Sequence, residues 1–161
     1  MKNILYDRKK AVAYAIKWAK KRNPKYYDFS SIGGDCTNFV SQCIYAGVGV
    51  MNYKLSTGWF YSSPSLRAPS WTGVNEFYRF AVNNNSYGFY AELCSKSQLD
   101  LGDVIQLGRT DDDFYHTLIV SKIDNGEIFV CSHSRDFLSV PLETFPIMKI
   151  RFLHVLGARS E

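Results

Sequence analysis

The stretch that decides the fold of this chain is a glycine turn followed at once by an apolar helix, Gly33-Gly34-Asp35-Cys36-Thr37-Asn38-Phe39-Val40-Ser41-Gln42. A thiol in the first helical turn lies beside unpaired backbone N–H groups and the positive end of the helix dipole, and both favour the thiolate. The same N–H groups can bind the oxyanion that forms when a thiolate attacks a carbonyl carbon. Cys36 is therefore a candidate nucleophile.

Two histidines downstream lie in segments that predict neighbouring strands. His116 is in a run of aromatic and β-branched residues, which an Asn-Gly turn separates from the run that ends at His133. If the pairing of Asp124 with Glu127 continues along both strands, His116 and His133 are diagonal neighbours on one face, about 7 Å apart at Cβ. A bulge in either strand would break this register.

This register assigns His116 the role of general base and His133 that of the residue that orients it. Asp136 is the main alternative for the orienting role. His154 has no partner that the sequence suggests, and we expect it to be structural. The other three cysteines are at positions typical of buried, small apolar side chains: Cys43, Cys94 and Cys131.

Four further residues are candidates for supporting the chemistry. We expect Asp35 to cap the helix that begins at Cys36, although as a neighbouring charge it would also raise the pKa of the thiol. Tyr26 is a candidate donor to the oxyanion. Trp59 and Trp71 lie in or beside a long irregular segment, residues 48–70, where they could bind substrate or instead pin this loop to the core.

Four strings of sequence together resemble the "putative amidase" domain family, a branch of the papain-like NlpC/P60 and CHAP group of bacterial cysteine hydrolases: Asp35–Gln42, Ser70–Thr72, Gly102–Gln106 and His116–Val120. The resemblance runs from about Tyr6 to about Leu142. It implies a papain-like fold with Cys36 as nucleophile, His116 as base and His133 as the polar third residue. It also implies cleavage of amide bonds, with the stem peptides of peptidoglycan as the usual substrate class.

The order of the predicted elements is α+β, with helices first and an antiparallel sheet afterwards, in a single domain over residues 1–161. The helices are expected over 8–22 with Asp7 as cap, over 36–46 with Gly47 after the end, and over 72–82 with Thr72 as cap. The expected strands are 87–92, 104–107, 115–121, 128–133 and 149–156.

Composition narrows the class of protein. The 161 residues are 46% hydrophobic and 21% charged, which is typical of a soluble globular domain. The net charge of +4 comes largely from lysines of the first helix, a surface suited to an anionic polymer such as cell wall. No nucleic-acid-binding motif, membrane-spanning run or signal peptide is present, so we expect a cytoplasmic protein or a domain cut from an exported one.

The sequence thus predicts a monomeric cysteine amidase or peptidase that works through a thioester and needs no metal or organic cofactor. Its second oxyanion donor is not identified. Three alternatives stay open. The same scaffold could transfer the acyl group to an amine or lipid, it could be an intracellular peptidase or deamidase, or it could be a non-catalytic module that binds peptides or cell wall.

Overall fold

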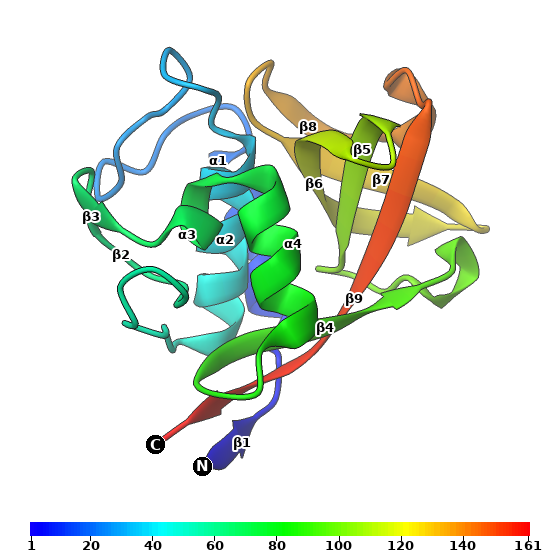
Figure 1. The fold of residues 1–161 in the computed structure, drawn as a ribbon. Coiled ribbons are helices and arrows are strands. Elements are labelled where there is room, and N and C mark those ends of the chain that lie inside the picture. The colour runs from blue at the N-terminus through cyan, green and yellow to red at the C-terminus, as the bar shows by residue number, and fades with distance from the viewer.

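The computed structural model describes all residues from 1 to 161, and it packs helices against a curved antiparallel sheet (Figure 1). The helices are α1 (Arg8–Trp18), α2 (Cys36–Val48), α3 (Pro69–Thr72) and α4 (Val74–Asn83), with two short 3-10 turns, η1 (Lys96–Gln98) and η2 (Leu142–Thr144). The strands are β1 (Lys2–Ile4), β2 (Tyr61–Ser63), β3 (Leu66–Arg67), β4 (Gly88–Cys94), β5 (Val104–Thr110), β6 (Asp113–Asp124), β7 (Glu127–Ser132), β8 (Phe137–Pro141) and β9 (Lys149–Ser160).

The main sheet has the strand order β1-β9-β5-β6-β7-β8, and β4 pairs with β9 as well. Every pairing in it is antiparallel, and β1 brings the N-terminus beside the C-terminal strand β9 (Figure 1). Strand β6 contacts three of the helices, α1, α2 and α4, so the helical layer packs on this strand. The predicted α+β class with an antiparallel sheet is confirmed.

Helix α2 is the centre of the core. All but two of its 13 residues are buried, because the helices and the sheet enclose it. Side chains of β6 and β7 alternate between two apolar clusters. Ile119 and Cys131 join the cluster around α2, while Leu118 and Val130 join a second cluster on the opposite face of the sheet. A helix buried to this extent holds its first residue, Cys36, in a fixed place.

Several predicted element boundaries are wrong. Helix α1 begins as expected, with Oδ1 of Asp7 accepting the N–H of Lys10 at 3.1 Å, but it ends at Trp18. Helix α2 continues past Gly47 and ends at Val48, and the capping residue Gly49 has a positive φ of 70°, which suits glycine. Thr72 caps no helix. It is the last residue of α3, and Gly73 separates α3 from α4.

The register of β6 and β7 also differs from the prediction. Asp124 pairs with Glu127 as expected, but a bulge lies between Val120 and Lys122, and beyond it Val120 pairs with Val130. The extra residue moves every later pair by one position, which exchanges the two faces of β7 relative to β6. His133 therefore leaves the sheet on the face opposite to His116.

Candidate active site

Cys36 is the first residue of α2, and its side chain is 7% exposed. The backbone N–H groups of Thr37 and Thr117 both favour its thiolate, as does the Thr37 hydroxyl. Burial outweighs them and raises the pKa of the thiol above its ordinary value of 9.0, and the charge of Asp35 raises it further. The helix N-terminus therefore does not produce a resting thiolate, and Cys36 is a protonated thiol at neutral pH.

Asp35 stands at the N-cap position, but its side chain accepts no hydrogen bond from a backbone N–H of the first turn of α2, so the predicted cap is wrong. Its Oδ1 accepts instead from the backbone N–H of Phe29 at 2.8 Å and from the Asn38 amide at 2.9 Å. Its Oδ2 lies 2.6 Å from Nδ1 of His133. Because no side chain caps the helix, the backbone N–H of Cys36 has no partner and is free to bind an oxyanion.

His133 does not orient His116. The ring is 2% exposed and stacks on Phe39 with 4.0 Å between centroids, on the α2 side of the sheet. Nδ1 faces Asp35, and Nε2 lies 2.8 Å from the backbone oxygen of Trp18. Both ring nitrogens of His133 thus have partners other than His116. This follows from the bulge in β6, which places the two histidines on opposite faces of the sheet.

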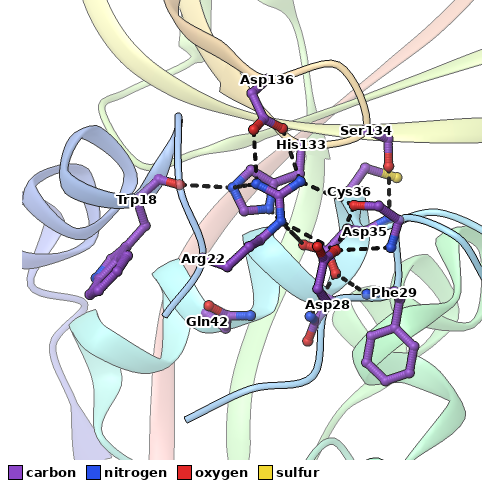
Figure 2. A network of polar contacts seen from close by, with 12 residues as sticks. Trp18, Arg22, Asp28, Phe29, Asp35, Cys36, Gln42, His133, Ser134 and Asp136 are labelled. Carbon is purple, nitrogen blue, oxygen red and sulfur yellow. Dashed lines mark hydrogen bonds and ion pairs between the residues drawn. The ribbon is translucent and has the colours of Figure 1, made fainter. Parts of the chain in front are cut away.

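Arg22 connects this histidine to three acidic residues (Figure 2). Its guanidinium donates two hydrogen bonds to Asp136, at 2.9 and 3.0 Å, and pairs with Asp28 at 3.2 Å and with Asp35 at 3.6 Å. Asp136 is therefore not a partner of His116 either. The network ties the chain after α1, the turn before α2 and the turn after β7 together around the start of the Cys36 helix.

His116 is held by a residue that the sequence did not single out, Ser132. The serine Oγ lies 2.8 Å from Nε2 of His116 and donates its proton to the backbone oxygen of His133 at 3.0 Å. Since a carbonyl oxygen only accepts, the serine oxygen must accept the Nε2–H of the imidazole. This fixes the tautomer: Nδ1 carries the lone pair and makes no hydrogen bond within the protein. Burial lowers the pKa of His116 to about 4, so the imidazole is neutral at pH 7.

Helix α2 and strand β6 meet through the residues that follow Cys36 and His116, Thr37 and Thr117. The Thr37 and Thr117 hydroxyls are 2.9 Å apart, and the N–H that joins His116 to Thr117 is one of the donors that favour the Cys36 thiolate. No hydrogen bond joins Sγ of Cys36 to the imidazole in this unliganded structure. The backbone N–H that follows His116 thus reaches the thiol, while the imidazole itself makes no hydrogen bond to it.

The two tryptophans are core residues, which contradicts the substrate-binding role predicted for them. Trp59 and Trp71 are both 0% exposed. Their indole N–H groups donate to Ser41 Oγ at 3.1 Å and to Asn38 Oδ1 at 3.0 Å, so they pin the irregular segment onto α2. Tyr26 packs on Trp71 and Tyr61. Burial raises its pKa to about 12, and its hydroxyl makes no hydrogen bond to Cys36.

The remaining titratable groups form no second site of this kind. His154 has a partner after all, Asp103, whose carboxylate lies 2.7 Å from its Nδ1 and also binds Arg8. No three side chains of His, Cys, Asp or Glu are grouped so as to hold a metal ion. None of the helices is long and apolar enough to cross a membrane.

Comparison with known proteins places the chain. A family model described as "Putative amidase domain" matches residues 5–156. The chain belongs to this family. It is similar to two uncharacterized proteins of Bacillus subtilis (strain 168). It is 36% identical to YhbB over 126 residues, which are 76% of this chain and 39% of YhbB. It is 30% identical to YjcM over 141 residues, which are 83% of this chain and 32% of YjcM.

The chain spans about a third of the length of these two relatives. No solved structure matches it significantly. The region that the amidase family model covers contains every candidate site residue, from Arg22 to Asp136. The family description indicates hydrolysis of amide bonds. The residues of this chain whose geometry bears on that activity are Cys36, His116 and Ser132.

Proposed function

We propose that this amidase-family protein is a cysteine hydrolase, with Cys36 as nucleophile and His116 as general base. The observation that carries the proposal is the hydrogen bond between Oγ of Ser132 and Nε2 of His116. Ser132 accepts the Nε2–H and donates its own hydrogen bond to a backbone oxygen, which leaves Nδ1 without a hydrogen-bond partner and able to accept a proton.

The reaction begins with two neutral groups. The pKa of the thiol is raised and that of His116 lies at about 4, so a resting thiolate–imidazolium pair is unfavourable at pH 7. The thiol proton passes to Nδ1 as Sγ attacks the amide carbonyl carbon, once substrate brings Sγ and Nδ1 within hydrogen-bond distance. Loose contacts of this kind in unliganded sites tighten in the complex with substrate.

The oxygen of the tetrahedral intermediate accepts the free backbone N–H of Cys36. His116 then gives the proton from Nδ1 to the amide nitrogen, the C–N bond breaks, and a thioester remains on Sγ. Water attacks the thioester carbon while its proton passes to Nδ1. The C–S bond breaks, the carboxylic acid leaves and Sγ regains its proton.

The substrate class that we propose is a peptide amide of the peptidoglycan stem-peptide type. The net charge of +4 supports it, because lysines exposed on and after α1 offer a basic surface to an anionic polymer. The buried tryptophans leave recognition of the substrate to other residues of the surface around Cys36.

The test is hydrolysis of defined stem peptides and cross-linked muropeptides, with products identified by liquid chromatography and mass spectrometry. Cys36→Ala should abolish cleavage, whereas Cys94→Ser, a matched thiol removal outside the site, should leave it intact. Rapid quenching should trap an acyl group on the peptide that contains Cys36. Cleavage by the Cys36→Ala protein would overturn the mechanism, and so would an acyl group on another residue.

A further inference from the structure

A chain of hydrogen bonds crosses four elements and ends at the Cys36 thiol. Nε of Arg151, on β9, donates to Oε1 of Gln106, on β5, at 2.8 Å. Nε2 of Gln106 donates to Oγ1 of Thr117, on β6, at 3.2 Å. Thr117 Oγ1 lies 2.9 Å from Thr37 Oγ1, which lies 3.8 Å from Sγ of Cys36.

The orientation of the Gln106 amide is fixed at both ends. Arginine only donates, so the atom that faces Arg151 must be the oxygen. The backbone oxygen of Val74 only accepts, and it lies 2.9 Å from the other amide atom, which must be the nitrogen. The amide therefore presents N–H, and never oxygen, to the Thr117 hydroxyl.

The direction of the next two bonds follows. The Thr117 oxygen accepts from Gln106, so its proton needs an acceptor, and its other side-chain partner is the Thr37 oxygen. If Thr37 donated to Thr117 instead, the buried Thr117 proton would have no acceptor, which is costly. Thr37 therefore accepts from Thr117 and points its own proton at Sγ of Cys36.

The far end of the chain is a cation held in place. The Arg151 guanidinium lies between the rings of Tyr78 and Phe114, 3.6 and 3.8 Å from their centroids. It also donates to Oδ1 of Asn75 at 3.2 Å. The side chains of Gln106, Thr117 and Thr37 are completely buried, so water does not compete for these bonds.

We propose that Gln106, Thr117 and Thr37 are positioning residues that form a one-way donor relay, anchored by Arg151, which stabilises negative charge on Sγ of Cys36. The inference rests on the proposed role of Cys36 as nucleophile, because a donor fixed on Sγ lowers the energy of the thiolate that attacks the amide. Burial raises the pKa of the Cys36 thiol, and the hydrogen bond from the Thr37 hydroxyl acts in the opposite direction. This agrees with a hydroxyl that donates to Sγ.

The experiment measures the thiol itself. The full chain is alkylated with iodoacetamide between pH 6 and 10.5, and the rate at Cys36 is followed by mass spectrometry of its peptide. Thr117→Val keeps the shape and breaks the relay, so the pH midpoint should rise by about one unit and the rate at pH 7.5 should fall about tenfold. Thr117→Ser restores the hydroxyl and should restore the wild-type profile.

Gln106→Glu provides a second break, because a carboxylate accepts from Thr117 and reverses the relay. Gln106→Glu should raise the pH midpoint of alkylation at Cys36. It tests the relay if thermal melts show that Thr117→Val does not fold. A wild-type midpoint in a folded Thr117→Val or Gln106→Glu protein would overturn the relay while the hydrolase proposal stands. If the variants show the predicted shifts but the wild-type protein cleaves no amide, the hydrolase proposal is overturned and the relay is supported.

Discussion

Oγ of Ser132 and Nε2 of His116 are 2.8 Å apart, and the serine hydroxyl is itself directed to a backbone oxygen. The pair holds the imidazole as the tautomer that has its lone pair on Nδ1. Ser132 is completely buried and comes from β7, whereas His116 comes from β6, so the bond also joins two strands at the candidate site.

Replacing Ser132 with alanine should lower kcat by about 100-fold, because the ring loses both its orientation and its tautomer preference. Ser132→Thr retains the hydroxyl and should retain most of the activity. The measurement is steady-state kinetics on the stem-peptide substrate, together with thermal melts of both variants. A Ser132→Ala enzyme with wild-type kcat would show that the bond has no part in catalysis.

Replacing His133 with alanine should act on stability rather than on the chemical step. The change removes the partner of the buried Asp35 carboxylate and the ring stacked on Phe39, so we expect a loss of about 3 kcal/mol. Urea unfolding measures it. Asp136→Asn, which weakens the partly exposed pair with Arg22, is the matched control and should cost about 1 kcal/mol or less.

If His133 were instead the group that orients the base, His133→Ala would lower kcat by orders of magnitude while its unfolding midpoint stayed near that of the wild type. That pair of results would return the orienting role to His133 and remove it from Ser132.

Cys36 should be the first of the four thiols to react with iodoacetamide at neutral pH, although Cys94 is less buried. The free Nδ1 of His116 can accept the thiol proton, and the N–H groups at the start of α2 favour the anion. His116→Gln should slow alkylation of Cys36 by at least about tenfold and leave Cys94 unaffected. Mass spectrometry of the peptides follows each thiol, and faster reaction of Cys94 in the wild type would count against the assignment.

The sequence predicted the elements that local patterns specify. Helix α2 begins at Cys36, where a glycine turn precedes a stretch with apolar residues at helical spacing. Strands β6 and β7 join at the Asn-Gly pair, with Asp124 opposite Glu127. Strands β1, β2, β3 and β8 were missed because each is short and none is fully buried, so none shows a clear alternating pattern; β2 and β3 lie in the segment predicted to be irregular.

The candidate site was predicted in part, and its errors have a common origin in tertiary contacts. The bulge between Val120 and Lys122 carries no glycine or other mark in the sequence, yet it exchanges His133 for Ser132 beside His116. Asp35 has the position and residue type of a cap, but His133 arrives from 98 residues away and takes its carboxylate. Neither contact is encoded by neighbouring residues.

His116 should make the protein less stable in acid. Its pKa is about 4 when folded, because burial disfavours the imidazolium, and near 6.5 in an unfolded chain. Above pH 6.5 both states are neutral and the group does not affect stability. As the pH falls from 6.5 to 4 the unfolded chain binds a proton that the folded protein does not, so up to about 3 kcal/mol of stability is lost.

His116→Gln removes this titration and should therefore lose about 3 kcal/mol less than the wild type between pH 7 and pH 4. Urea unfolding at a series of pH values measures the difference. Tyr115→Phe, a change at the exposed neighbour that keeps His116, should show the full wild-type loss. If the wild type and His116→Gln lose equal stability over this range, the imidazole is not the buried neutral base that the bond to Ser132 requires.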